Sequence, residues 1–585
     1  MTPIDAGSRA ERIVAAALWI GVAVCVATVA WGAWRGLDIT DSGFYLLSAR
    51  YPDEVLATVT SFHRYTAPVF AAVGYDVGWF RLAGLALVLV SALVLADGVR
   101  RYCAAHAEAP SLMAGVSPLI VLGVLLQYGW GLPTPGYNLL NAAAVALSAG
   151  LMLPALATAS EQRRAADLRF AAVGALVAVS LFCKVTTGLA LIALYGLAPW
   201  ILAATVPVRR SLMAMVLGGI VWSALHFYLF ESPAFWWASW QRGLGFTAVL
   251  GGGHGAGLTL KYLHEGGVVA LATARRFWLV VVPFGIAAWL IGRGRSAASL
   301  VAIALALGSI IVTWRGYFGG MHIGGDGNLR NVLPVYVAIA GVTIGAVIVA
   351  RTGLNRRQWS VVGWMMALAL AGAAGTAVPL QLNVMLYFGP ALAAVGLLLS
   401  RLMPGQGRTV ALAVTGLFAT SQIVTAGEAG PYRLNAPMSR QTEHTTIGVP
   451  AHDLMLDAAT SRFFVSIRRV AMDCGFKPGD DVLGFFWMPG ILFALGARAP
   501  GGTWFSAGYP GSRAVNEKLL ESLPMERMRR AFILHKVASP EAMPDLAAHG
   551  LDFPAGYRRC GGAVWPLTGQ EVILYRPAGR EPASP

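Results

Sequence analysis

The stretch IVAAALWIGVAVCVATVAWGAWRGLDITDSGFYL (Ile13–Leu46) joins an apolar segment directly to an acidic sequence. Its apolar part is about 20 residues long, the helical length that crosses the hydrocarbon core of a bilayer. Asp38 and Asp41 follow, one helical turn apart. Because lipid supplies no water to solvate a carboxylate, acids beside a membrane-spanning end need a partner or a chemical role.

Apolar segments of this kind fill roughly the first 426 residues. We count thirteen, which begin near Ile13, Trp79, Leu112, Tyr137, Phe170, Leu189, Leu212, Phe277, Ser299, Val332, Trp359, Val384 and Val410. The 585-residue chain is 56% hydrophobic and only 12% charged, with mean hydropathy +0.62, whereas soluble proteins average about 25% charged residues. We therefore expect a polytopic α-helical membrane protein with about 13 transmembrane helices in residues 1–426.

The net charge of +15 would point to nucleic acid in a soluble protein. Here most arginines lie in short alternate connections, such as those holding Arg100, Arg209 and Arg356, although Arg275 and Arg276 fall in an outward one. This is the positive-inside bias of a chain whose N-terminus is cytoplasmic, so no nucleic-acid partner is expected. The Arg-rich, Lys-poor usage indicates a bacterial source, hence a plasma (inner) membrane protein. Thirteen crossings place its C-terminus in the periplasm or outside the cell.

Two outward connections, residues 34–76 and 231–276, are long. Apolar positions recur at helical spacing in the first, which predicts one or two short helices on the membrane face. The second carries Trp236, Trp237 and Trp240, typical of the interfacial aromatic belt, and a glycine run that reads as a hinge or a plain linker.

Composition becomes more polar near Gly427. Strands are expected at 481–486, 530–537 and 571–577, and helices at 488–497 and 514–523. This alternation predicts an extracytoplasmic α/β domain over residues 427–585.

Five cysteines follow the same division. Cys25, Cys103 and Cys183 lie in or beside apolar segments and are expected to be small core residues. Cys474 and Cys560 lie in the outward C-terminal part, where disulfides can form. The sequence leaves open whether these two cysteines pair. The spacing contains no metal-type cysteine pattern, and the sequence has no nucleotide-binding loop or nucleophile elbow. No cofactor is firmly predicted, although a divalent metal remains open.

Asp41 is the strongest catalytic candidate, with Asp38 beside it. A carboxylate at the outer membrane face can act as a general base that removes a proton from an acceptor hydroxyl. The alternative is structural: either acid could cap a helix that contains Gly43–Ala49.

The first loop resembles that of the GT-C superfamily of membrane glycosyltransferases. In the aminoarabinose and protein O-mannosyl transferases, which include family 39-like proteins, this loop begins Asp-Glu-x-x-Tyr. Asp41 matches the Asp and Tyr45 the Tyr, whereas Ser42 replaces the second acid. The resemblance implies a GT-C-like fold, a polyprenyl-phosphate-linked sugar as donor, and roles for Asp41 in catalysis and Tyr45 in substrate binding.

Further polar residues are candidates for substrate binding. Lys184 interrupts an apolar run, where burying a charge is costly, so a charged residue there suggests a functional role. Its ammonium could bind a phosphate, or the side chain could extend to the membrane interface. The glycine-rich loop Trp314–Pro334 contributes Arg330, suited to bidentate phosphate contact, together with His322, Asp326 and Asn328. His63 and Arg64 are weaker candidates, because a solvated helix face explains them as well.

Together these features predict an inverting glycosyltransferase of the cell envelope. It would move a sugar from a polyprenyl-phosphate donor to an acceptor hydroxyl of a glycan, lipid or protein at the outer face of the membrane. The leaving phosphate is a weak base, so one catalytic acid plus cations would suffice. The alternatives are a transporter or flippase of lipid-linked saccharides and a non-catalytic envelope-assembly protein.

Overall fold

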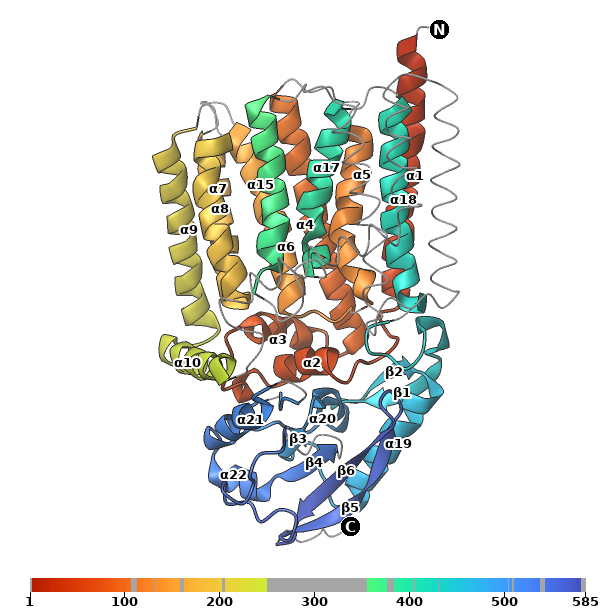
Figure 1. Ribbon diagram of the computed structural model, residues 1–585, viewed down its shortest axis with the longest axis vertical. Coiled ribbons are helices and arrows are strands. Elements are labelled where there is room, and N and C mark those ends of the chain that lie inside the picture. The colour runs from red at the N-terminus through yellow and green to blue at the C-terminus, as the bar shows by residue number, and fades with distance from the viewer. Residues whose placement is uncertain are drawn as a thin grey trace.

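The computed structural model places a bundle of long helices above a mixed α/β region (Figure 1). It describes residues 3–106, 113–131, 133–157, 163–202, 206–249, 355–375, 383–402, 406–429, 431–502, 504–507, 510–536 and 542–579. The start of α1 lies at the far end of the bundle from residues 431–579, hereafter the C-terminal region (Figure 1).

Among the described residues, six helices are long and apolar enough to cross a membrane. They are α1 (Pro3–Trp31, apolar from Arg9), α4 (Val77–Ala105), α6 (Tyr137–Ala157), α7 (Arg163–Cys183), α8 (Val185–Leu202) and α9 (Val208–Leu229). Further apolar helices are α5 (Met113–Leu125) with η3 (Leu126–Trp130), α15 (Arg356–Ala373), η5 (Val384–Tyr387) with α17 (Phe388–Leu402), and α18 (Gln406–Ala429). The prediction of a polytopic helical membrane protein is confirmed. The predicted segments near Phe277, Ser299 and Val332 lie outside the described residues, so the number thirteen stays a prediction.

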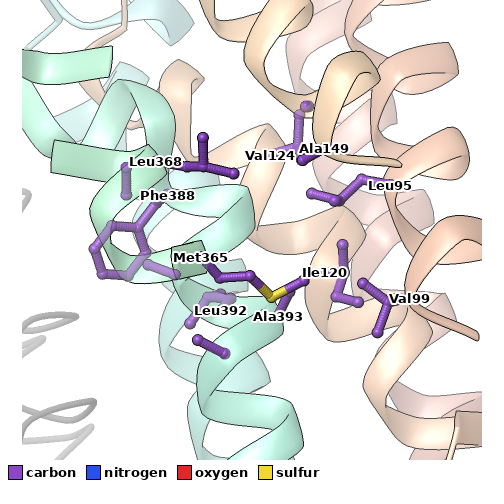
Figure 2. Close-up of a cluster of buried hydrophobic side chains, with 14 of the residues drawn as sticks. Leu95, Val99, Ile120, Val124, Ala149, Met365, Leu368, Phe388, Leu392 and Ala393 are labelled. Carbon is purple, nitrogen blue, oxygen red and sulfur yellow. The ribbon is translucent and has the colours of Figure 1, made fainter. Parts of the chain in front are cut away.

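The bundle core is built from aliphatic side chains of helices distant in sequence. Figure 2 shows α15 and α17 packing against α4, α5 and α6 through Leu95, Val99, Ile120, Val124, Ala149, Met365, Leu368, Phe388, Leu392 and Ala393. Helices α4 and α6 meet at Gly98 and Gly150, where a Cβ on Gly98 would lie 2.1 Å from the carbonyl oxygen of Gly150. Small residues at such crossings let membrane helices approach closely.

Short helices lie between the bundle and the C-terminal region (Figure 1). They are α2 (Asp41–Arg50), the 3-10 helix η1 (Pro52–Glu54) and α3 (Phe62–Ala72), which confirms the helices predicted for residues 34–76. The second long connection was expected to be a loop, but its first part is the 17-residue helix α10 (Pro233–Val249). Trp236, Trp237 and Trp240 recur at helical spacing and stack on one another along it. The rest of that connection lies outside the described residues.

The C-terminal region contains a hairpin and a four-stranded sheet. The hairpin pairs β1 (Glu443–Ile447) with β2 (His452–Leu456) and leads into α19 (Ala458–Asp473). The sheet has the order β3-β4-β6-β5, parallel between β3 and β4 and antiparallel elsewhere. Its elements are β3 (Val482–Phe485), α20 (Pro489–Leu495), α21 (Ser512–Glu521), α22 (Met525–Arg530), β4 (Phe532–Lys536), β5 (Tyr557–Trp565) and β6 (Gln570–Pro577). The three strands and two helices expected here are therefore all present.

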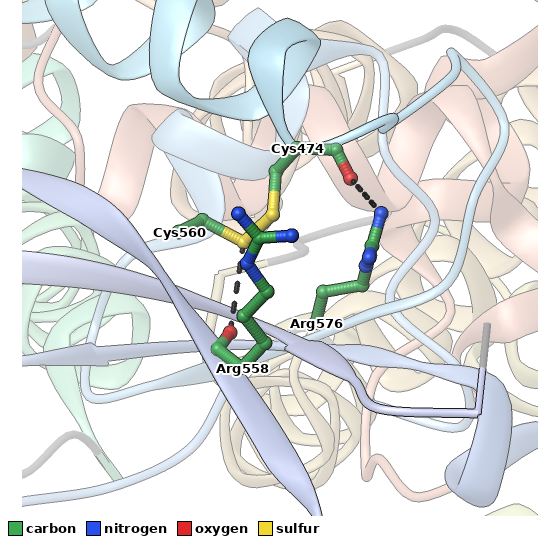
Figure 3. The surroundings of a disulfide bond; sticks show 4 residues. All are labelled: Cys474, Arg558, Cys560 and Arg576. Atoms are coloured by element: carbon green, nitrogen blue, oxygen red, sulfur yellow. Dashed lines mark hydrogen bonds between the residues drawn. A yellow bond between two sulfur atoms is a disulfide. The ribbon is translucent and has the colours of Figure 1, made fainter. Parts of the chain in front are cut away.

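A disulfide fastens α19 to the sheet. Cys474, at the end of α19, bonds to Cys560 in β5 with a Cα–Cα distance of 5.6 Å (Figure 3). Arg576 donates a hydrogen bond of 3.2 Å to the Cys474 carbonyl. The pairing that the sequence left open is formed, while Cys25, Cys103 and Cys183 are buried as predicted.

The C-terminal region packs directly on the first loop. The backbone of Gly490 in α20 donates a hydrogen bond of 2.8 Å to the Ile39 carbonyl. A Cβ on Gly43 in α2 would lie 2.2 Å from the Gly490 nitrogen, so both positions require glycine for this approach. The start of α2 is thereby held between the bundle and the C-terminal region.

Candidate active site

Asp38 is a structural acid. Its carboxylate is 2% exposed and accepts hydrogen bonds from the Thr40 nitrogen at 2.9 Å, the Thr40 hydroxyl at 2.7 Å and the Ser42 nitrogen at 2.9 Å. These bonds fix the turn that starts α2, so the capping alternative applies to Asp38. Burial, reinforced by the charge of Asp41, raises the pKa of Asp38 to about 6. A catalytic role for this residue stays a prediction that its full set of partners disfavours.

Arg81 in α4 anchors the turn before Asp38, and the sequence analysis missed it. It is 2% exposed. Its guanidinium donates to the carbonyls of Ala33, Arg35 and Gly36 at 2.9–3.0 Å and to the Thr134 hydroxyl at 3.1 Å. The sequence feature that could have identified Arg81 is its position in the first turns of an apolar segment, because a charge buried there must be fully paired.

Asp41 stands at the first position of α2 and keeps part of its carboxylate accessible. Its side chain is 25% exposed. The Tyr432 hydroxyl donates a short hydrogen bond to Oδ2, and Arg433 Nη1 lies 3.4 Å from the same oxygen. Arg433 also donates to the Thr40 hydroxyl at 2.6 Å. Within the described residues, both of these contacts engage Oδ2.

Tyr432 and Arg433 follow the last helix of the bundle and were not predicted. Burial, followed by the negative charge of Asp41, raises the pKa of the Tyr432 hydroxyl, so this group remains a proton donor toward Asp41. Arg433 has a backbone φ of +50°, in the left-handed region that costs a residue with a Cβ some strain. The sequence signal was weak: a Tyr-Arg pair just past an apolar segment.

Tyr45 lies in an aromatic cluster beneath α2. Its ring is 4% exposed and meets Phe62 and Tyr137 edge-on, at centroid distances of 5.5 and 5.9 Å. Gly136 admits this ring, since a Cβ there would lie 2.6 Å from it. Packing therefore accounts for Tyr45, and contact with a substrate stays a prediction.

Lys184 lies at the junction of α7 and α8 with 7% exposure. Its Nζ donates a hydrogen bond of 2.8 Å to the Gly372 carbonyl and sits 5.3 Å from the centre of the Tyr387 ring. Thr187 donates to the same carbonyl at 3.0 Å. Gly372 belongs to the last turn of α15, where exposed carbonyls attract cations. The ammonium thus already has an acceptor that a phosphate oxygen would have to replace.

Aromatic residues connect the neighbourhoods of Asp41 and Lys184. Tyr45 in α2 contacts Tyr137 in the first turn of α6. The next residue, Asn138, accepts a hydrogen bond of 3.1 Å from the Tyr387 hydroxyl, and the Tyr387 ring lies against Lys184. The two charged residues therefore share the face of the bundle that the C-terminal region covers.

His63 and Arg64 belong to a second buried cluster rather than to the surroundings of Asp41. Arg64 pairs with Asp53 at 2.5 Å and with Glu231 at 3.6 Å. Glu231 also contacts His226 Nε2 at 3.0 Å. Burial, then the charge of Arg64, lowers the pKa of His63 to about 3, so this imidazole is neutral near pH 7.

Four candidates cannot be placed: His322, Asp326, Asn328 and Arg330 lie outside the described residues. In the part of the chain that the structure describes, no group of three or more His, Cys, Asp or Glu side chains could hold a metal ion.

No protein-family model and no curated protein matches the chain. Two solved structures are similar to it. ArnT from Cupriavidus metallidurans bound to undecaprenyl phosphate is 15% identical, with a TM-score of 0.38, over 97% of this chain and 98% of that one. The apo state of the same protein is 16% identical, with a TM-score of 0.39, over 96% and 98%.

The chain is similar to ArnT. ArnT is an aminoarabinose transferase of the GT-C type, the group that the first loop resembles. The chemistry that the site can perform follows from its own groups. The most important is the Asp41 carboxylate, which is partly exposed and is held through Oδ2.

Proposed function

We propose that this protein is an inverting glycosyltransferase that uses a polyprenyl-phosphate-linked sugar at the outer face of a bacterial plasma membrane. The observation that supports this proposal is the environment of Asp41, whose side chain is partly exposed and is held through Oδ2 by Tyr432 and Arg433. A carboxylate so fixed is pre-oriented to accept a proton from an acceptor hydroxyl.

The reaction proceeds by direct displacement. As Asp41 takes the proton, the acceptor oxygen forms a bond to the anomeric carbon, and the bond from that carbon to the phosphate oxygen breaks on the opposite face. The polyprenyl phosphate leaves with the electron pair, and the configuration at the anomeric carbon inverts. The buried Lys184, and by expectation Arg330, would stabilise the developing phosphate charge.

The distribution of buried charge favours an enzyme over a transporter. Transporters place ionisable groups near the bilayer midplane, between broken helices. In the described bundle, the buried charged side chains are Asp38, Arg64, Arg81, Lys184 and Glu231. All five lie in loops or helix ends at the face that carries Asp41, where transfer to an external acceptor would occur.

The Cys474–Cys560 disulfide supports an outward C-terminal region. Disulfides persist in the periplasm and outside cells, whereas cytosolic reductants keep thiols reduced. Because Asp41 lies against this region through Gly43 and Gly490, the active site would face the same compartment.

The test uses the full-length protein in nanodiscs with a panel of undecaprenyl-phosphate-linked sugars and a cell-envelope extract as acceptor. We expect transfer, measured as released undecaprenyl phosphate and glycosylated product. Asp41→Asn should retain its thermal stability and lose transfer about 10²–10⁴-fold. Asp473→Asn, at an exposed acid on α19, is the matched control and should keep the wild-type rate.

Two outcomes would refute the proposal. One is full transfer by Asp41→Asn, which would remove the assigned base. The other is movement of lipid-linked sugar across the bilayer with no transfer by the wild-type protein, which would identify a flippase.

A further inference from the structure

The C-terminal region contains a cleft that the proposed transfer chemistry does not use. Its volume is about 770 Å³, within the range of roughly 300–1,000 Å³ that holds small ligands. Four arginines line it: Arg498, Arg527, Arg529 and Arg530. This concentration of guanidinium groups is a candidate site for an anionic ligand.

Arg527 is already committed to structural ion pairs. Its guanidinium contacts Asp481 at 2.6 and 2.8 Å and Glu54 at 2.9 and 3.1 Å. Glu54 belongs to the first loop, so this arginine joins the wall of the cleft to the loop that carries Asp41. Its partners neutralise it, and recognition of a ligand passes to the remaining arginines.

The other three arginines are exposed. Arg498 and Arg529 lie on the cleft wall, and Arg530 lies 3.8 Å from Glu526 with both side chains more than 80% exposed. An ion pair so open to water contributes little, so Arg530 can exchange it for a ligand at small cost. A planar guanidinium matches the two oxygens of a carboxylate or phosphate.

The cleft also presents acceptors and bare backbone. Asp480 and Asp552 stand among the arginines, and Gly479 and Gly550 leave the rim without side chains. Carboxylates accept hydrogen bonds from hydroxyl groups, while arginines donate to anions. This combination of hydrogen-bond donors and acceptors suits a polyhydroxylated, charged ligand.

We propose that this arginine–aspartate cleft binds a saccharide carrying a phosphate or carboxylate group, as an anchoring subsite for the acceptor. The acceptor role rests on the proposed transfer function, whereas saccharide binding does not. The ion pairs of Arg527 with Glu54 connect the subsite to the first loop, which favours an acceptor several sugar units long that extends from the cleft toward Asp41.

Binding is measured by calorimetry on the full-length protein in nanodiscs without donor. The probes are tetragalacturonate for the carboxylate, mannose 6-phosphate for the phosphate, and neutral maltotetraose as control. We expect one anionic probe to bind at least about 10-fold more tightly than maltotetraose, with an affinity that falls as salt rises. The variant Arg498→Gln/Arg529→Gln should weaken that binding about 10-fold or more. Arg469→Gln, an exposed arginine on α19 outside the cleft, should not change it.

The two proposals fail separately. Asp41→Asn should bind the anionic probe as the wild type does. Equal binding by the double arginine variant, or no binding of either anionic probe, overturns the subsite. In transfer assays the double variant should raise the acceptor KM about 10-fold with kcat unchanged; an unchanged KM would leave a binding cleft with no acceptor role and overturn that part of the inference.

Discussion

Two acids one helical turn apart have different environments in this chain. Asp38 accepts three hydrogen bonds from the turn that begins α2, whereas Asp41 accepts bonds at Oδ2 and is partly exposed. The motif at the first loop is local, so the sequence could single out Asp41 as a candidate, and its catalytic role stays a prediction. Tyr432 could not be predicted as its partner, since 391 positions separate them and sequence spacing says nothing about such distant pairs.

Asp38 should make stability depend on pH. Its pKa in the folded protein, about 6, lies above the ordinary value of 3.8. The folded state therefore gains stability from this residue below pH 4 and loses it as pH rises through 6, by about 3 kcal/mol in total. Melting curves of wild type and Asp38→Asn between pH 4 and 8 should differ in slope over this window. Parallel curves would show that Asp38 does not titrate there.

Lys184 offers a test of phosphate binding against helix capping. Lys184→Met keeps the length of the side chain and removes its charge, so the KM for the lipid-linked donor should rise about 10-fold or more. Thr187→Val removes a hydrogen bond to the same Gly372 carbonyl and no charge, and its KM should stay unchanged. If both variants lower the melting temperature and neither changes KM, the role of Lys184 is only to stabilise the C-terminal end of α15.

At the scale of elements, the sequence predicted segments with continuous apolar runs and missed segments in which polar residues or glycines interrupt the apolar pattern. The strands β3, β4 and β6 are short buried apolar runs. Strand β5 was missed because Arg558, Arg559, Gly561 and Gly562 interrupt its alternation, and a bulge falls among them. Helix α19 was missed although Phe463, Phe464, Ile467 and Ala471 recur at helical spacing, because its net polarity lowers any hydropathy average.

The disulfide joins these two missed elements, and its removal should be costly. It closes a loop with a sequence separation of 86 residues, for which loop-closure entropy gives about 4.6 kcal/mol. In Cys474→Ser/Cys560→Ser, amide hydrogen exchange in α19 and β5 should accelerate and the region should unfold at lower denaturant concentration. Added reductant should weaken the wild type and leave the variant unchanged. A variant that unfolds like the oxidised wild type would contradict this role.

At the scale of the whole molecule, composition was sufficient to predict the helical bundle. It could not predict where the C-terminal region packs against that bundle. A long apolar segment predicts a transmembrane helix without any information from the rest of the chain. The first loop and α20 approach most closely through backbone atoms at Ile39, Gly43 and Gly490. Apolar side chains such as Leu46 and Ile491 share one buried cluster there, but sequence spacing does not reveal which distant apolar segments pack together. The ion pairs of Arg527 with Glu54 reinforce this contact from segments 473 positions apart.

This glycine contact makes the position of Asp41 depend on the C-terminal region. A Cβ at Gly490 would lie 2.6 Å from the Ile39 Cα, a backbone clash that only separation of α20 from the first loop can relieve. Gly490→Ala should therefore lower the transfer rate at least about 10-fold and accelerate hydrogen exchange in α2. Gly363→Ala in α15, where a Cβ meets nothing within 4 Å, is the matched control. Wild-type transfer by Gly490→Ala would mean that the first loop holds Asp41 without help from the region that covers it.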